Sequence, residues 1–322
     1  MTYSSGSLIV ATDYNGFVST NASANVNGIW STGTTDAGYG QSALGTVAAT
    51  NTITATQWAS LVNTISSIAS HQGTTITSRA APTAGNIINI LAALNTDLTN
   101  CTTNRGNAAA NGTQFTGWTG TNSKTTTTSG ASWAITFTNT VTFASADAAR
   151  YFFNAGGRIK IDVAKSATGN TGDPEWNDLA TTLCGDIYIT GGTATQTIAG
   201  ASYTGTTKTG GTGTPTTLAT TTGWYDLTAG GAATIVYKQF ADTAPYTANF
   251  IQHSIAKGAG SDTLVITTLW QNTDSDPITG GTAPTAATPG TAPCTIVTYF
   301  PPSSTYLTTA AWGTPSVAAT VA

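Results

Sequence analysis

Apolar residues recur with helical spacing between residues 54 and 98. Thr54 and Gln57 match a capping box, in which each side chain accepts from the backbone amide of the other residue, and Gly73 can end the helix that follows. The first apolar stripe comprises Trp58, Leu61, Val62, Ile65 and Ile68, and the second comprises Ile87, Ile90, Leu91, Leu94 and Leu98. Two helices separated by about a dozen residues predict an antiparallel helical hairpin.

Residues 1–50 show no regular hydrophobic period. Aromatic rings are mixed there with Gly and Asn, as in "DYNGF" and "NGIWSTGTTDAGYGQ", which predicts an irregular N-terminal arm. Large rings would not remain in water, so they pack on the next segment or dock into a partner. Two helices alone bury little surface, so the arm, the β region or further copies of the chain must complete their core. The candidate oligomerisation or attachment face comprises Trp30, Trp58, Leu61, Ile65, Ile68, Ile87, Leu91 and Leu94.

Beyond residue 110 the hydrophobic period changes to two. "WAITFTNTVTF" alternates rings and aliphatic residues with Thr or Asn, and Gly, Pro and Asp separate the later runs "RIKIDV", "GDIYITG", "TIVYKQF", "FIQHSIAKG", "DTLVITTLW" and "CTIVTYF". Many short strands with such spacing predict a β-sandwich or a jelly roll. We therefore expect a mainly β protein in three parts: an irregular arm at 1–50, a helical hairpin at 51–110 and a β-sandwich domain at 111–322.

The stretch "ARYFFNAGG", residues 149–157, interrupts the strand pattern. Ser145 can cap a short helix, and Gly156 and Gly157 can end it before "RIKID" begins a strand. Phe152 and Phe153, with Phe143 before them, are expected to plug one end of the sandwich. The glycines are expected because a Cβ would obstruct the turn or its approach to a neighbouring strand. A ring-lined surface that stacks on sugars is the alternative interpretation.

Composition favours an assembly surface. Charged residues make up 7% of the chain, against roughly 25% in typical soluble domains. The net charge is −4, with no basic stripe, which argues against a nucleic-acid partner. Hydroxyl and amide groups cost less to bury against another subunit than unpaired charges. We therefore expect many copies to associate, although a charge-poor adhesin would have a similar composition. No apolar run approaches the ~18 residues of a membrane span, so membrane insertion is not expected.

Four acids lie close together in "TGDPEWNDLATTLCGD": Asp173, Glu175, Asp178 and Asp186. A pair of carboxylates could serve as acid and base of a glycosidase. However, "PEWNDLATTL" also reads as a short helix with acids in its first turn and with Trp176 and Leu179 on its buried side. We favour this structural interpretation.

Other candidate chemistry is weak. Asp274 and Asp276 in "NTDSDP" lack the Gly and Glu of a calcium loop. His71 and His253 belong to no catalytic motif, and the position of His71 at a helix end favours an interaction with the helix dipole. The three cysteines, Cys101, Cys184 and Cys294, are widely separated and are expected to be buried free thiols. We therefore expect no catalytic residues, no cofactor and no metal site, and we predict that the protein is not an enzyme.

Several segments together resemble a family of tailed-bacteriophage virion structural proteins, which includes tail-fibre-like and unassigned structural proteins. They are "GSLIVATDYNGF", "IWSTG", "GYGQ", "TITATQWASLVNTISSIASHQG", "TFASADAARYFFNAGGRI" and "EWNDL". The resemblance covers about residues 5–75 and 115–190. It implies a component of the virion, assembled in the host cytoplasm and in contact with copies of itself and with other virion proteins. It implies no reaction.

The expected function is therefore that of a non-enzymatic virion protein, with a tail fibre or another appendage as the first choice. Its N-terminal part would attach it, and the sandwich would project. The alternative is a carbohydrate-binding adhesin in which Trp224, Tyr225 and Tyr246, in the turn-flanked stretches "GWYDL" and "APYTANF", contact a host surface glycan. A polysaccharide depolymerase, resting on the acid cluster alone, is a third hypothesis.

Overall fold

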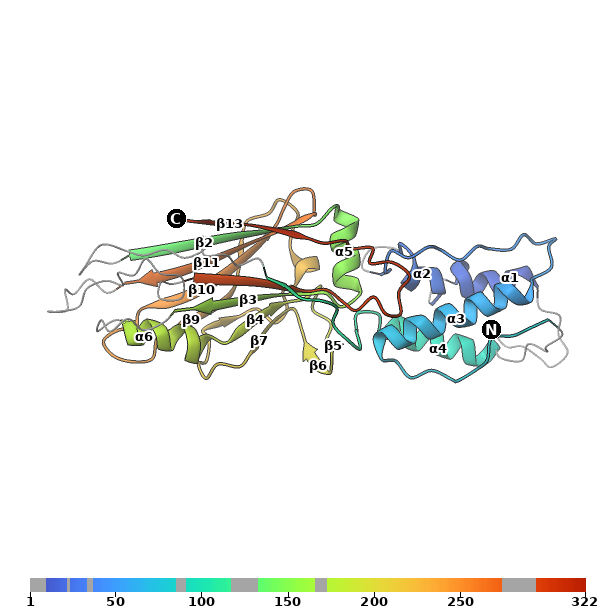
Figure 1. Ribbon diagram of the computed structural model, residues 1–322, viewed down its shortest axis with the longest axis horizontal. Coiled ribbons are helices and arrows are strands. Elements are labelled where there is room, and N and C mark those ends of the chain that lie inside the picture. The colour runs from blue at the N-terminus through green and yellow to red at the C-terminus, as the bar shows by residue number, and fades with distance from the viewer. Residues whose placement is uncertain are drawn as a thin grey trace.

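The computed structural model describes residues 10–21, 24–33, 37–84, 91–116, 133–165, 173–273 and 294–322. Within them the chain is mainly β with a helical N-terminal region, as the sequence predicts. The helices lie at one end of an elongated molecule and the strands at the other (Figure 1). Ile87 and Ile90 of the predicted second stripe, and the side chain of Leu91, lie outside the described residues.

The arm contains short helical turns where the sequence predicts irregular structure. They are α1 (Ala11–Asn15), the π-helical η1 (Gly16–Thr20) and α2 (Val26–Trp30). The rings of Tyr14 and Phe17 lie against Trp58, with centroids 5.4 and 6.4 Å away. This packing stabilises turns whose Gly and Asn content gives them little helix propensity of their own.

The long helix α3 (Ala55–Gln72) begins and ends at the predicted residues. Thr54 Oγ1 accepts a hydrogen bond from the Gln57 amide at 3.2 Å, and Gln57 Oε1 accepts one from the Thr54 amide at 2.8 Å. Gly73 follows in the left-handed region with φ +70°. Both signals depend only on residues within one turn, which is why the sequence reveals them.

The next helix, α4 (Leu91–Thr103), runs parallel to α3, so the predicted antiparallel hairpin is wrong. Gln72, at the end of α3, donates to the carbonyl oxygen of Cys101, near the end of α4, at 3.0 Å. Residues 74–84 run back beside the helices without regular secondary structure. An extended residue advances about 3.3 Å against about 1.5 Å in a helix, so a short return segment can cover the length of α3.

Two antiparallel sheets form the sandwich. The five-stranded sheet has the order β1 (Phe115–Thr116), β12 (Cys294–Phe300), β3 (Arg158–Ala164), β4 (Asp186–Ile189) and β7 (Thr206–Thr209). The six-stranded sheet has the order β13 (Ser316–Val321), β2 (Trp133–Thr142), β11 (Thr263–Asn272), β10 (Phe250–Lys257), β9 (Thr234–Phe240) and β8 (Thr217–Leu218). A separate hairpin pairs β5 (Gln196–Ile198) with β6 (Ala201–Tyr203). Burial alternates along β10 and β11, which places one face of each strand in the core.

Helical segments close both ends of the sandwich. The helix α5 (Ala146–Asn154) carries the chain from β2 in one sheet to β3 in the other, at the end that faces the helical region (Figure 1). At the opposite end, α6 (Asp173–Asp178) and the π-helical η3 (Leu179–Cys184) join β3 to β4. Trp176 and Leu179 are buried there, as the helical spacing predicts.

One hydrophobic cluster runs from the arm through α3 and α4 into the sandwich. Polar contacts also cross this junction. His71 Nε2 lies 3.0 Å from the Ala155 carbonyl oxygen, and Asn154 Nδ2 donates to the Gly38 carbonyl at 2.8 Å. The buried Gln41 side chain bonds the loop that precedes β13. The arm and the β region thus complete the helical core within a single chain.

Candidate functional site

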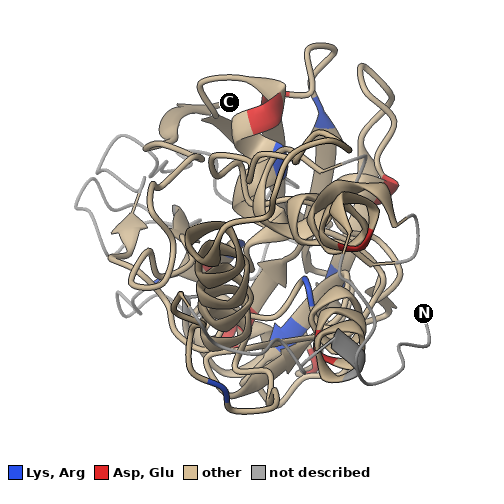
Figure 2. Ribbon diagram, turned by 90° about the vertical axis from the view of Figure 1, so that its right-hand side faces the viewer, with Lys and Arg blue, Asp and Glu red and all other residues tan. Residues whose placement is uncertain are grey.

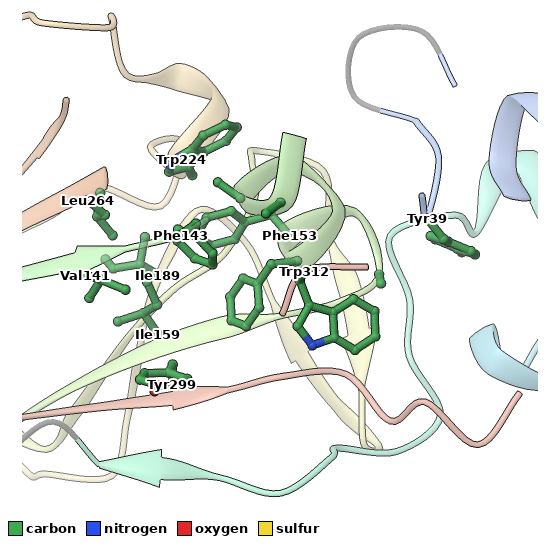
Figure 3. Close-up of a cluster of buried hydrophobic side chains, with 14 of the residues drawn as sticks. Tyr39, Val141, Phe143, Phe153, Ile159, Ile189, Trp224, Leu264, Tyr299 and Trp312 are labelled. Atoms are coloured by element: carbon green, nitrogen blue, oxygen red, sulfur yellow. The ribbon is translucent and has the colours of Figure 1, made fainter. Parts of the chain in front are cut away.

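The aromatic corner lies where α5 covers the end of the sandwich (Figure 3). Ring centroids are 5.2 Å apart for Phe143 and Phe152, and 5.1 Å apart for Phe152 and Phe153. All three side chains are buried, and tilted or edge-to-face pairs of this kind are the favoured arrangement of aromatic rings. The rings therefore hold α5 against the sheets and present no surface on which a sugar could stack.

Gly156 and Gly157 allow α5 to turn directly into β3. Gly156 has φ +91°, and a Cβ added there would lie 2.7 Å from the Cβ of Ala108. A Cβ added at Gly157 would lie 2.5 Å from the carbonyl oxygen of Phe152. Both positions require glycine. At Gly157 a Cβ would obstruct the turn itself, which is one of the two predicted reasons, and at Gly156 the close neighbour is the loop after α4 in place of a strand.

Trp224 is buried, so the prediction that it contacts a glycan is wrong. It begins the 3-10 turn η4 (Trp224–Asp226) and stacks on Phe153, with centroids 5.3 Å apart. The Lys257 ammonium lies 4.0 Å from the Trp224 ring centroid. A cation over an indole face is attractive, more so when water is excluded. Gly223 and Asp226 of "GWYDL" indicate a bend, and in the structure this bend places the indole in the interior.

Tyr225 is half-buried and lines a cavity of about 200 Å³ at the junction. Its hydroxyl lies 3.2 Å from the Arg150 carbonyl oxygen and also contacts the side chain of Asn154, so the ring is fixed in place. The lining is otherwise largely polar and includes Arg105, Asn107, Gly191, Gly192, Gln196 and Asp226. A fixed ring beside hydrogen-bonding groups in a cavity of this size suits one sugar residue or a similar small polyol.

Tyr246 lies at the other end of the sandwich, in the loop between β9 and β10. Thr243 of the same loop lies beside Glu175 of α6, whereas Tyr225 contacts α5. Successive connections of an antiparallel sheet lie at opposite ends of its strands. The predicted glycan contacts therefore do not converge on one surface.

The candidate oligomerisation face is internal to the chain. The described side chains are each at most 5% exposed: Trp30, Trp58, Leu61, Ile65, Ile68 and Leu94. The rings of the arm and the apolar side of α4 cover α3. The arm and the β region cover these residues within the same chain. They are therefore not available to contact another copy.

The predicted acid cluster separates in the structure. Glu175 is buried in α6, and burial raises its pKa. Asp186 lies instead beside β3, 3.3 Å from the Lys160 ammonium. The side chain of Asp173 lies outside the described residues. Asp178 of the same helix and Asp242 lie near Glu175 and also raise its pKa, whereas Asp186 is paired with Lys160, so the four predicted acids do not form a single cluster.

The two histidines are buried and far apart. Burial lowers the pKa of His71 to about 4 and that of His253 to about 3, so both are neutral at pH 7. His71 therefore serves α3 through a neutral hydrogen bond to Ala155, not through a charge against the helix dipole. His253 Nδ1 lies 2.9 Å from Thr268 Oγ1. Both side chains stabilise the interior of the fold.

Cys101 and Cys184 are buried free thiols, and burial raises the pKa of each to about 12. The side chain of Cys294 and the residues Asp274 and Asp276 lie outside the described parts of the chain. Within the described parts, no group of three or more His, Cys, Asp or Glu side chains could hold a metal ion.

Sequence reasoning missed the buried Arg158. Its guanidinium carbon lies 4.4 Å from the Tyr203 ring centroid and 5.2 Å from that of Phe300, and Nη2 donates to Asn111 Oδ1 at 2.6 Å. Burial lowers its pKa. The rings come from β6 and β12, which are distant in sequence, so no local signal could have identified this cluster.

Fold and site together define a class: a two-sheet antiparallel β protein, closed at one end by an N-terminal helical region, with a small polar cavity at the junction. No protein-family model matches the chain, and the searches of curated proteins and of solved structures found no match. Across the described ranges, no helix combines the length and hydropathy needed to cross a membrane. The resemblance to tailed-phage virion proteins stays a prediction.

Proposed function

We propose that this protein is a non-enzymatic structural component of a tailed-phage virion, a tail fibre or another appendage. The uncharged outer surface of β13, β2, β11 and β10 carries the proposal; on the next strand, β9, Lys238 lies beside Gln252 on the same side. The registers of β13, β2, β11 and β10 place their outward side chains in continuous rows. We call these rows the neutral face: Thr136, Thr138, Thr140, Thr142, Gln252, Ser254, Ala256, Thr263, Val265, Thr267, Leu269, Ser316, Ala318 and Thr320.

The neutral face suits contact between subunits. Its hydroxyl and methyl groups are half-buried or exposed, and none of its members is charged. Such groups can be covered by a neighbour at less cost than unpaired Lys or Glu, because no ion loses its hydration. Elsewhere the charged residues are few and dispersed along the chain (Figure 2). A surface of this kind fits a particle in which many copies pack together.

The shape of the subunit supports an appendage. The helical region and the sandwich share one hydrophobic cluster, and His71, Asn154 and Gln41 bond across their junction. The two ends are therefore held at a fixed orientation. In the proposed role the helical end attaches to other virion proteins and the sandwich projects from the particle.

The direct test is incorporation into particles. Mass spectrometry of gradient-purified virions from infected cells should detect the chain in many copies per particle. A Thr267→Glu variant places a charge at the centre of the neutral face and should be depleted from particles by at least about tenfold while its folding is unchanged. The control is Thr221→Glu, at an exposed residue in a turn outside this face. Absence of the natural chain from particles, or equal incorporation of both variants, would contradict the proposal.

A glycan-binding role is the second candidate, and the cavity beside Tyr225 favours it. Arg105, Asn107 and Asp226 provide hydrogen-bonding groups around the fixed ring. Saturation-transfer NMR of the full chain with a panel of monosaccharides tests this role. Binding that is lost in Asp226→Asn and kept in Asp242→Asn, an exposed acid in the loop that holds Tyr246, would support it. A panel without any bound sugar would reject it.

A further inference from the structure

The strand β13 forms one edge of the six-stranded sheet and pairs with β2 on one side. Thr136 and Ala322 exchange two backbone hydrogen bonds of 2.9 Å. Hydrogen-bonded and non-hydrogen-bonded pairs alternate along an antiparallel ladder, so Ser316, Ala318 and Thr320 also bond to β2. The N–H and C=O groups of Val317, Ala319 and Val321 therefore point outward. No other described strand pairs with this edge.

The remaining sheet edges are short or carry a charge. The edge strands β1 and β8 have two residues each. The edge strand β7 contains Lys208, whose ammonium is bonded to the carbonyls of Gly211 and Gly213 at 2.9 and 2.8 Å. Short strands and lysines are the usual protection of a sheet edge against pairing. The edge of β13, with the sequence SVAATV, has neither protection and is the longest edge among the described strands.

We propose that β13 pairs with β13 of a second copy, antiparallel and about a two-fold axis at Ala319, to join the two six-stranded sheets into one. In this register Ala319 faces its own equivalent, and Val317 faces Val321 of the other copy. All the outward N–H and C=O groups of both strands are then paired. No charged residue meets a like charge, because β13 contains none. A two-fold contact closes on itself and requires no third copy.

The side chains fit the same register. Val317 and Val321 pack against the hydrophobic core from the inner side of β13. Across the axis they would extend that core with a β-branched pair, an arrangement that stabilises antiparallel strands. On the outer side, Ala318 would lie opposite Thr320 of the second copy, and the neutral face would continue from one copy to the other. In the particle, this pairing would join neighbouring copies of the chain, and in that respect it rests on the proposed function.

Cross-linking of the purified full chain tests the register. In a Cys294→Ser background, Ala319→Cys places two thiols on residues whose Cα atoms are about 5.5 Å apart, within the range of a disulfide. The control Val317→Cys lies on the same strand and the same face, but its two copies are roughly 14 Å apart. Mild oxidation should link Ala319→Cys into a covalent dimer and leave Val317→Cys monomeric. Equal linkage of both variants, or linkage of Val317→Cys alone, overturns the register.

Sedimentation of the purified chain tests the contact itself. The natural chain should form a dimer at micromolar concentrations. Ala319→Pro removes an outward N–H without removing a bond to β2, and it should weaken the dimer by at least about tenfold, since two hydrogen bonds are lost at the axis. Ala319→Ser keeps the N–H and should dimerise normally. A natural chain that is monomeric at about 100 μM overturns the edge pairing, and it leaves the virion role to the particle experiment.

Discussion

At the residue scale, two separate restrictions prevent any residue with a Cβ from replacing Gly156. Its φ of +91° lies in the region that residues with a Cβ avoid, and the space that a Cβ would need is occupied by Ala108. The sequence indicates the turn through "NAGG". The second restriction depends on Ala108, which a bridge to Ile198 fixes from another part of the chain.

Gly156→Ala should therefore destabilise the protein by more than a backbone effect alone. The left-handed backbone costs about 1–2 kcal/mol for a residue with a Cβ, and overpacking adds about 1–3 kcal/mol. The matched control is Gly200→Ala, where φ is +80° and nothing lies within 4 Å of the added Cβ. Urea denaturation should give a clearly larger loss for Gly156→Ala than for Gly200→Ala. Equal losses would show that the contact with Ala108 relaxes freely.

Protonation of the two buried histidines sets a dependence of stability on pH. The folded protein holds the pKa of His71 at about 4 and that of His253 at about 3, below the value of about 6.5 in an unfolded chain. Below pH 6.5 the unfolded state therefore binds protons that the folded state does not bind. The free energy of unfolding should fall from pH 6.5 toward pH 4, by up to about 1.4 kcal/mol per pH unit for each histidine.

Urea denaturation at pH 7, 6 and 5 measures this slope. Replacing His253 with Gln should reduce the slope by the contribution of that residue, whatever the change in stability at pH 7. Burial raises the pKa values of Asp162 and Glu175. As the pH falls, protonation of these carboxyls therefore favours the folded state and opposes the effect of the histidines on the free energy of unfolding. A natural chain whose stability is constant between pH 7 and 5 would contradict this prediction, because it would mean that the folded and unfolded states take up protons equally over that range.

At the element scale, the return segment 74–84 decides the direction of α4. Asp97 of α4 accepts a hydrogen bond from the Thr77 amide at 3.1 Å and forms a buried ion pair with Arg79. These contacts hold the segment beside the helices. The two apolar stripes are consistent with parallel and antiparallel helices alike, because a stripe defines a face and carries no information on the direction of a neighbour.

Asp97→Ala should release the return segment. Loss of one partner of a buried ion pair leaves the other charge unpaired and costs about 3–5 kcal/mol. Hydrogen exchange should then increase for the amides of residues 74–84. The control is Asp147→Ala, which breaks the solvent-exposed pair with Arg150 and should cost about 1 kcal/mol or less. Comparable costs of the two substitutions would contradict the structural role of the Asp97 pair.

Local signals predict the elements better than their placement. The capping box of α3, the helix α5 with its glycine corner and the alternating strands were predicted because neighbours in the sequence determine them. Trp224 was misjudged because its burial depends on Phe153 and Lys257, which belong to α5 and β10. The cavity beside Tyr225 could not be predicted, since its lining comes from the end of α4, from α5, from the β4–β5 loop and from η4.

At the scale of the whole molecule, the helical region and the sandwich form one interior. The hydrophobic cluster includes Trp58 of α3, Phe153 of α5 and Trp270 of β11. Each part therefore contributes side chains to an interior that it shares with the other. The arm, which the sequence suggests as a means of attachment to a partner, serves first as part of this interior.

The chain should therefore unfold in one cooperative transition. Far-UV circular dichroism reports mainly on the helices, and tryptophan fluorescence reports on both parts. The two curves should coincide in thermal and urea denaturation. Two separated transitions would show that the helical region and the sandwich are independent domains.

The amino-acid sequence alone predicts where α3 begins and ends, the helix α5 with its glycine corner, and the strands β2, β3, β4, β9, β10, β11 and β12, because each of these elements follows from residues within a few positions of one another. It does not predict the helical turns of the arm or the strand β13. The folded arrangement is needed to establish that α3 and α4 are parallel, that the aromatic rings of the arm are buried and that β13 lies at an open edge. These features depend on contacts between residues far apart in the chain. Local patterns allow several arrangements of the same elements, and burial in one shared core selects among them.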